Sequence, residues 1–228
     1  MAERVALMRA SALFTGLLQD ELREIAECSE VRTFARNELL FMQGETVRSL
    51  VLIQTGSVKV TQLSAGGNES LLWLNGTGET VGAHHIAPHC THSCSARTME
   101  QCTMVTWRYA ELQQLMLQFP RIRRNVSQIL FDRLTELEVR FREVATEKVA
   151  MRVASALLRL MKQVGKPAAQ GTEISLSREE LAQMTGCTLF TVSRLVSAWA
   201  EQGIVLARRE AVVVLDAVRL AQVGEADA

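Results

Sequence analysis

The period of the apolar residues changes at Pro120, and this change constrains the fold more than any other feature of the sequence. Between Val31 and Pro120, short runs rich in Val, Leu and Thr are separated by glycines, which is typical of antiparallel sheets. After Pro120, apolar residues recur at intervals of three and four, which is the period of amphipathic helices. The sequence therefore predicts an α+β chain in which a sheet domain comes first.

The glycine-separated runs predict the strands of a closed β domain. They span residues 38–41, 49–54, 57–63, 70–74 and 103–107. Gly66-Gly67-Asn68 lies between two of these runs and predicts a hairpin tip. Closure into a small barrel or jelly roll removes exposed strand edges, so we expect that architecture after one or two short helices within residues 9–28.

Five apolar residues after Pro120 form a heptad seam, because the steps between them are 4, 3, 4 and 3. They are Leu130, Leu134, Leu137, Phe141 and Val144. Charged residues flank the seam, as expected where one stripe of a helix packs on a second helix and the rest meets water. The seam predicts a helix that pairs two copies of the chain. Because two heptads are few, the alternative is that the stripe packs on its own domain.

Residues 177–199 carry the local signals of two helices joined by a tight turn. Ser177 and Glu180 have the spacing of a capping box, and Thr188 can cap a second helix. Gly186 permits the left-handed conformation that a tight turn between helices demands. The segment predicts either a generic helical hairpin or a helix-turn-helix.

Two short strands are expected after these helices, with Arg208 and Arg209 at the tip between them. Such a wing can reach phosphates beside a groove of duplex DNA, while the amino end of the second helix meets base edges. The chain has no net formal charge, which argues against binding nucleic acid by bulk charge alone. We therefore expect basic side chains to be sorted onto one face.

The order of β roll, dimer helix and winged helix-turn-helix resembles the CRP/FNR family of bacterial transcription regulators over essentially the whole chain. The segments that carry the resemblance are GSVKV (56–60), GETVG (78–82), the dimer helix and, above all, LSREELAQMTGCTLFTVSRLVSAWAEQGIV (176–205). The last segment is highly specific. The resemblance implies a homodimeric, DNA-binding transcription regulator that reads a palindromic operator under the control of an effector.

The same resemblance implies a division into three parts and a set of partners. We expect an effector-sensing β-roll domain at residues 1–119, a dimerisation helix at 120–145 and a winged helix-turn-helix domain at 146–228. The expected partners are double-stranded DNA, a second copy of the chain and RNA polymerase. No continuous apolar stretch is long enough to span a membrane and no signal peptide is present, so a cytoplasmic location is expected.

By resemblance, the second helix of the motif faces the operator, and Arg194 forks onto O6 and N7 of a guanine. The expected DNA-binding residues are Thr188, Leu189, Phe190, Thr191, Ser193, Arg194, Arg208 and Arg209. Family members often have a glutamate where this chain has Phe190. A phenyl ring cannot accept a hydrogen bond from a cytosine amino group, but it can touch a thymine methyl, so a different half-site is expected.

The effector is not identified by the sequence. In relatives that bind cyclic nucleotides, a Gly-Glu pair holds the ribose and an Arg-Ser or Arg-Thr pair holds the phosphate. Here His92 stands in the arginine position and Leu137 replaces a small hydroxyl residue, so cAMP is not expected. The candidate effector pocket is Gly78, Glu79, His84, His92, Ser93 and Leu137.

The four histidines lie within residues 84–92, which leaves several chemistries open. Haem is one, because His84 aligns approximately with the histidine that ligates iron in the carbon-monoxide-sensing member. Others are a metal-free surface loop, thiol oxidation, zinc, or an iron-sulfur cluster. The zinc set is His89, Cys90, His92 and Cys94, and the iron-sulfur set is Cys28, Cys90, Cys94 and Cys102.

Two other function classes are weighed against a regulator. An enzyme is not expected, because no nucleophile triad, phosphate-cradling glycine loop or paired carboxylates occur at a suitable spacing. A ligand-sensing dimeric adaptor without sequence-specific DNA binding would share the β roll and the dimer helix. The complete helix-turn-helix pattern favours the regulator.

Overall fold

The computed structural model describes residues 1–82 and 90–223. Two compact units make up the chain. The first contains Met1–Gln62 and Asn75–Glu136, and the second contains Leu63–Leu74 and Leu137–Ala228. The three domain limits expected from the sequence stay a prediction.

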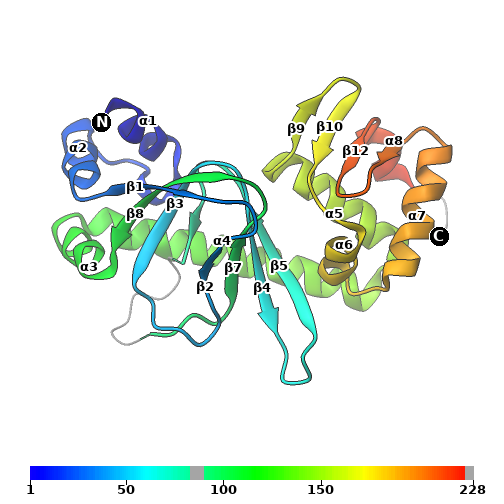
Figure 1. Cartoon of the computed structure of the whole chain (residues 1–228), viewed down its shortest axis with the longest axis horizontal. Helices are drawn as coiled ribbons and strands as arrows, with labels where there is room; N and C mark the ends of the chain where they lie inside the picture. Colours follow the sequence, from blue (N-terminus) through cyan, green and yellow to red (C-terminus); the bar gives the residue numbers. More distant parts are fainter. Residues whose placement is uncertain (83–89, 224–228) are drawn as a thin grey trace. The chain divides into compact units, whose positions relative to one another are not determined.

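The first unit opens with short helices and continues into antiparallel strands (Figure 1). The helices are α1 (Ala2–Ala10), η1 (Ala12–Phe14) and α2 (Gln19–Glu27). The strands of the roll are β1 (Glu30–Phe34), β2 (Leu39–Phe41), β3 (Ser49–Thr55), β4 (Val58–Leu63), β5 (Glu69–Asn75), β6 (Thr80–Val81), β7 (Ser95–Thr98) and β8 (Cys102–Arg108). Of these, β5 up to Leu74 is grouped with the second unit. They form two sheets, in the orders β1-β8-β3-β6 and β2-β7-β4-β5.

The predicted β roll is therefore confirmed, and each of the five expected runs contains or overlaps a strand. The turn between β4 and β5 also lies where Gly66-Gly67-Asn68 predicts it, with Ser64 N donating to Asn68 O at 2.9 Å. Sequence reasoning missed β1, β6 and β7. Most residues of β1 are exposed, β6 has only two residues, and β7 (Ser-Ala-Arg-Thr) contains a single apolar residue, which is too few to indicate a strand.

The core of the first unit lies between β3, β8 and the surrounding helices. Trp107 is fully buried there, its ring centroid is 5.4 Å from that of Phe14, and its Nε1 donates to Ile25 O at 2.9 Å. The same cluster takes in residues of α3 (Tyr109–Gln118) and the first turns of α4 (Pro120–Thr146). This packing ties the start of α4 to the β roll.

The second unit is a small mixed domain. Its helices are α5 (Val149–Gln163), α6 (Arg178–Thr185), α7 (Leu189–Glu201) and α8 (Ala217–Gln222). Its sheet has the order β11-β12-β10-β9, with β9 (Lys166–Ala168), β10 (Gly171–Ile174), β11 (Val205–Ala207) and β12 (Val212–Val214). Figure 1 shows α6 followed directly by α7, the arrangement that the sequence predicts.

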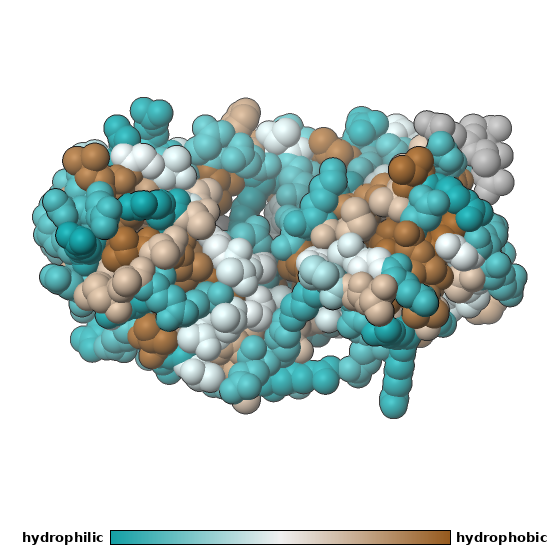
Figure 2. All heavy atoms as spheres, turned by 90° about the horizontal axis from the view of Figure 1, so that it is seen from above, coloured by the Kyte–Doolittle hydropathy of each residue, from teal (hydrophilic) through white to brown (hydrophobic). Residues whose placement is uncertain are grey.

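The surface mixes polar and apolar residues. On the face drawn in Figure 2, separate hydrophobic patches lie among hydrophilic side chains. Of the helices within residues 1–82 and 90–223, none combines the length and apolar character needed to cross a bilayer.

Candidate DNA-binding and effector sites

The helix α6 begins at a complete capping box. Ser177 Oγ accepts from the backbone N–H of Glu180 at 3.1 Å, and the Glu180 carboxylate accepts from the backbone N–H of Ser177 at 2.9 Å. These two bonds satisfy backbone donors that a helix leaves unpaired at its start. The predicted start of the motif is confirmed.

The turn between α6 and α7 depends on Gly186. Its φ of 63° and ψ of 42° place it in the left-handed region, and its N–H donates to Ala182 O. Two residues later Thr188 caps α7, because its Oγ1 accepts from the backbone N–H of Thr191 at 3.1 Å. The sequence prediction for both residues is confirmed, and the turn fixes where α7 begins.

The helix α7 buries one face and exposes the other. Val192, Val196 and Trp199 are buried in the domain core. Arg194 is exposed on the opposite side, and Thr191 and Ser193 are half-buried. Leu189 and Phe190, the first two residues of the helix, have exposed fractions of 49% and 76%. The predicted DNA-reading residues therefore gather at the accessible amino end of α7.

The strands β11 and β12 form the expected hairpin, closed by a 2.9 Å bond from Arg208 N to Ala211 O. Arg208 and Arg209 are exposed at its tip, as predicted. The Arg208 guanidinium is also ion-paired with Glu173 on β10. Part of the positive charge of the wing is therefore neutralised within the domain.

A half-buried acid, Glu79, and a half-buried base, Arg133, interact electrostatically in the β roll. The Glu79 carboxylate accepts from Gly76 N at 2.7 Å, and burial raises the pKa of Glu79 while the Arg133 charge acts in the opposite direction. Arg133 reaches in from α4 and donates to Thr80 O at 3.4 Å, and burial lowers its pKa. Sequence analysis found Glu79 but missed Arg133, because Arg133 looks like one of the ordinary charged residues beside the heptad seam.

Asn75 adds an open acceptor to this cluster. Its side chain bonds to Glu79, and the resulting stabilisation of the carboxylate opposes the burial effect on the pKa of Glu79. Its Oδ1 is buried and has no hydrogen-bond partner among the described residues. A buried acceptor without a donor is costly, so a ligand that donates a hydrogen bond here would be stabilised. The polar cluster of the β roll is defined here as Asn75, Glu79 and Arg133.

His92 lies inside the roll as a stacked ring. Its side chain is buried against Phe41, with the ring centroids 3.6 Å apart and the planes within 7° of parallel. Backbone bonds to Gly44 and Glu45 hold the segment in place. The position that the resemblance places at the arginine of cyclic-nucleotide-binding relatives is thus a packed imidazole in this chain.

The other candidate effector residues differ in their exposure. Gly78 is in the left-handed region and donates to Ile53 O at 2.8 Å. Ser93 is exposed, and Leu137 is 41% exposed on α4. His84, the candidate haem ligand, lies outside the described residues, as does His89 of the candidate zinc set.

The cysteines do not form a metal centre within the described part of the chain. No group of three or more His, Cys, Asp or Glu side chains in residues 1–82 and 90–223 is placed to hold a metal ion. Cys102 is fully buried with its Sγ 3.4 Å from Ser57 O, whereas Cys28 is exposed. All five cysteines are free thiols.

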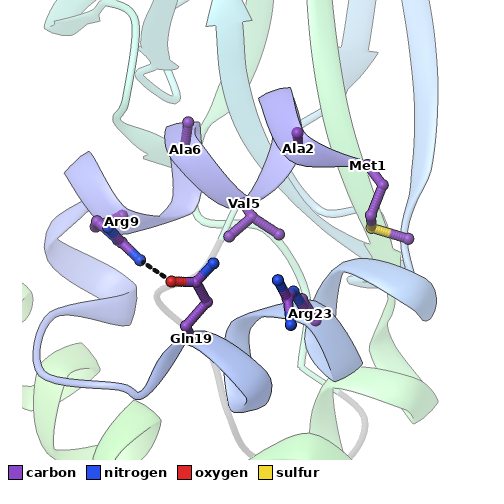
Figure 3. A pocket seen from close by; sticks show the side chains of 7 residues that line it. All are labelled: Met1, Ala2, Val5, Ala6, Arg9, Gln19 and Arg23. Atoms are coloured by element: carbon purple, nitrogen blue, oxygen red, sulfur yellow. Dashed lines mark hydrogen bonds between the residues drawn. The ribbon is translucent and has the colours of Figure 1, made fainter.

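A surface pocket of about 490 Å³ lies between α1 and α2 (Figure 3). Its lining residues are Met1, Ala2, Val5, Ala6, Arg9, Gln19 and Arg23. Arg9 donates to Gln19 Oε1 at 3.0 Å, and Arg23 is ion-paired with Asp20 at 3.0 Å. Both arginines thus already have partners on the pocket's own helices, and sequence analysis did not mark this place.

Comparison with known proteins matches both halves of the chain. Residues 31–119 match the cyclic nucleotide-binding domain family, and residues 151–223 match the Crp-like helix-turn-helix domain family. The "Cyclic AMP receptor protein" of Thermus thermophilus is 29% identical over 198 residues, which cover 87% of this chain and 89% of that protein. The "Transcriptional activator protein Anr" of Pseudomonas protegens is 25% identical over 203 residues, which cover 88% and 82%.

Solved structures agree with these matches. The "c-di-GMP Responsive Global Regulator CLP" of Xanthomonas campestris is 26% identical, with a TM-score of 0.72 and coverage of 86% of this chain and 98% of that chain. The Thermus thermophilus catabolite activator protein is 28% identical, with a TM-score of 0.54 and coverage of 96% and 100%. The chain belongs to the CRP/FNR family of DNA-binding transcription regulators.

Proposed function

We propose that two copies of this chain pair through α4 and place two α7 helices on a palindromic operator, under the control of an effector bound in the β roll. The main support for pairing through α4 is the exposure of the apolar residues of the heptad seam. Its exposed fractions are 38% at Leu130, 55% at Leu134, 41% at Leu137, 77% at Phe141 and 52% at Val144. An apolar stripe of this regularity is typical of a helix that packs on a second helix.

The free energies of burial and association indicate that pairing through the seam depends on each of its residues. About half of each side chain is already covered, so full burial contributes about 1 kcal/mol per residue. Two copies together then gain roughly 10 kcal/mol, against a cost of association of roughly 4–15 kcal/mol. Because these terms are close, one charge placed in the seam is expected to separate the two copies.

We therefore expect Leu137→Glu to make the protein monomeric at micromolar concentration and to weaken operator binding at least tenfold. Light scattering after size exclusion measures the mass, and gel retardation measures the affinity. The matched control is Leu117→Glu, because Leu117 is 61% exposed on α3, away from the seam. A Leu137→Glu variant that stays dimeric with unchanged affinity would contradict the proposal.

DNA reading is tested with a random duplex pool. We expect the protein to enrich a palindrome with half-sites centred about 34 Å apart, one helical turn of DNA. Arg194→Ala is expected to abolish the enrichment, because it removes the forked donor from the exposed face of α7. Protein-free cell extract supplies small molecules during the selection. A dimer that still enriches no duplex would instead be a ligand-sensing adaptor without sequence-specific DNA binding.

The polar cluster of the β roll supports an effector that carries an anionic group and a hydrogen-bond donor. Arg133 would hold the anion, and the open Oδ1 of Asn75 would accept from the donor. Some relatives are named for cAMP, but here the stacked His92 supplies no charged fork for a cyclic phosphate. We infer that cAMP is not the effector.

Two measurements test this inference about the effector. Titration calorimetry with cAMP is expected to show no binding at millimolar ligand, and binding at micromolar ligand would overturn the inference. An absorption spectrum with metal analysis of protein purified without a histidine tag tests haem on His84. A Soret band that shifts with carbon monoxide would make the protein a haem gas sensor and replace the small-anion effector proposed here.

The remaining parts of the proposal follow from family membership. A regulator of this type acts together with RNA polymerase, so we propose that the DNA-bound dimer contacts the polymerase and works in the cytoplasm. Co-retention of purified RNA polymerase on an operator fragment that carries the dimer tests this contact.

A further inference from the structure

We propose that Phe190 reads the methyl group of a thymine in each half-site, so that this regulator uses an apolar contact at the amino end of α7. The proposal rests on the DNA binding described above and adds a base preference to it. Phe190 is the second residue of α7 and has an exposed fraction of 76%.

The exposed ring of Phe190 is not needed to hold α7 in place. The start of α7 is already capped by Thr188, and the helix is anchored by the buried side chains of Val192, Val196 and Trp199. Leu189 beside it is also 49% exposed, so two large apolar side chains sit together on an otherwise polar helix end. An apolar pair on the surface that meets another macromolecule marks a contact rather than a packing role.

The chemistry of the major groove determines which base can lie against the Phe190 ring. Among the four bases only thymine presents a methyl group there, whereas the other base edges present donors and acceptors. A phenyl ring against a polar edge would leave those groups without partners, at a cost in affinity. The ring is therefore complementary to thymine and unfavourable for cytosine, which offers an amino donor.

The position of Phe190 relative to Arg194 gives the place in the half-site. Residues four apart lie on the same face of a helix, separated by about 6 Å along its axis. Arg194 is exposed, and its guanidinium matches the O6 and N7 acceptors of guanine. Because base pairs are stacked about 3.4 Å apart, we expect the thymine one or two base pairs from the guanine that Arg194 contacts.

The decisive experiment removes the methyl group alone. The operator is first selected from a random duplex pool with the full-length protein, in the presence of protein-free cell extract. Deoxyuridine then replaces the conserved thymine, since it pairs identically and lacks only the methyl. Burial of one methyl corresponds to about fourfold in affinity, so the loss should be about fourfold per half-site and roughly fifteenfold for the symmetric site.

The Phe190→Ala variant completes a double-mutant cycle. We expect it to bind the thymine and deoxyuridine operators equally well, and to lose the thymine preference when selection is repeated. Its melting temperature should match that of the wild type because the ring is exposed. Leu117→Ala is the matched control, an exposed apolar residue of α3 that should retain the full deoxyuridine effect.

The outcomes distinguish a failure of the methyl contact from a failure of operator binding. Equal wild-type affinity for the two operators, or an undiminished deoxyuridine penalty in Phe190→Ala, overturns the methyl contact while DNA reading stands. If Phe190→Ala loses the same factor of affinity as measured against the wild type on both operators, the ring contacts the sugar-phosphate backbone instead of the methyl group. This result also overturns the methyl contact. If no duplex is enriched at all, the operator proposal itself fails, and the methyl contact with it.

Discussion

At the scale of single residues, Glu79 and Arg133 illustrate how burial changes a charge. Both side chains are partly removed from water, which raises the pKa of the acid and lowers the pKa of the base, while their mutual attraction acts in the opposite direction for each. Glu136 also faces Glu79 and raises its pKa further. An acid whose pKa is raised by folding makes the folded state sensitive to pH.

We predict that Glu79→Gln removes part of this sensitivity. Glu79 stabilises the fold fully below its ordinary pKa of 4.5, and that contribution is lost as the pH rises through the higher pKa of the folded state. The variant should therefore gain stability relative to the wild type between about pH 5 and about pH 7.5. Urea unfolding at these two pH values measures the change, with the exposed Glu69→Gln as control. A constant difference between variant and wild type would argue against the burial effect.

At the scale of elements, an ion pair joins α4 to α5 in the second unit. The two terminal guanidinium nitrogens of Arg159 donate to the Glu143 carboxylate, at 2.5 and 2.9 Å, and the Glu143 side chain is only 8% exposed. A bidentate pair with a buried carboxylate and a half-buried guanidinium holds two helices in one geometry, although the pair as a whole adds little net stability. Loss of one partner leaves the other charge poorly solvated.

Glu143→Ala is accordingly expected to lower the free energy of unfolding by about 3 kcal/mol. The double variant Glu143→Met with Arg159→Leu should recover most of this loss, because no unpaired charge remains. Thermal and urea unfolding measure both variants. Asp20→Ala, which breaks an exposed pair with Arg23, is the control and should change stability by less than about 0.5 kcal/mol. If Glu143→Ala and Asp20→Ala lowered the free energy of unfolding equally, burial would not explain the effect at Glu143.

At the scale of the whole molecule, the proposed control by an effector would require that the β4–β5 hairpin, α4 and the helix-turn-helix be connected. Arg140 of α4 donates to the carbonyl oxygens of Leu72 on β5 and Met184 on α6, and its guanidinium lies 5.4 Å from the centre of the Trp73 ring. All these residues belong to the second unit. One side chain thus links three segments that are far apart in the sequence.

We expect Arg140→Ala to loosen the β5 hairpin without unfolding α6 and α7. Amide hydrogen exchange in residues 63–74 should become at least tenfold faster, while the core of α7 keeps its protection. Arg140→Lys is the conservative control; it should restore part of the protection through its charge but lacks the planar fork. Unchanged exchange in the hairpin would mean that Arg140 does not connect these segments.

The sequence by itself determined the elements whose signals are local. The capping box at Ser177, the left-handed Gly186 and the cap at Thr188 act over three or four residues, so their positions could be predicted and are confirmed. The same holds for the long helix α4, because a heptad is read directly from spacing. The resemblance to a family rests on these same local segments.

Only the tertiary structure decided which distant residues meet. Arg133 reaches Glu79 across more than fifty residues, β1 pairs with β8 although its own sequence shows no strand period, and the His92 ring stacks on Phe41. No local rule predicts these contacts, because they arise when the roll closes and burial forces polar groups to find partners. The DNA-reading motif is thus predictable from sequence, whereas the effector site depends on how the roll packs.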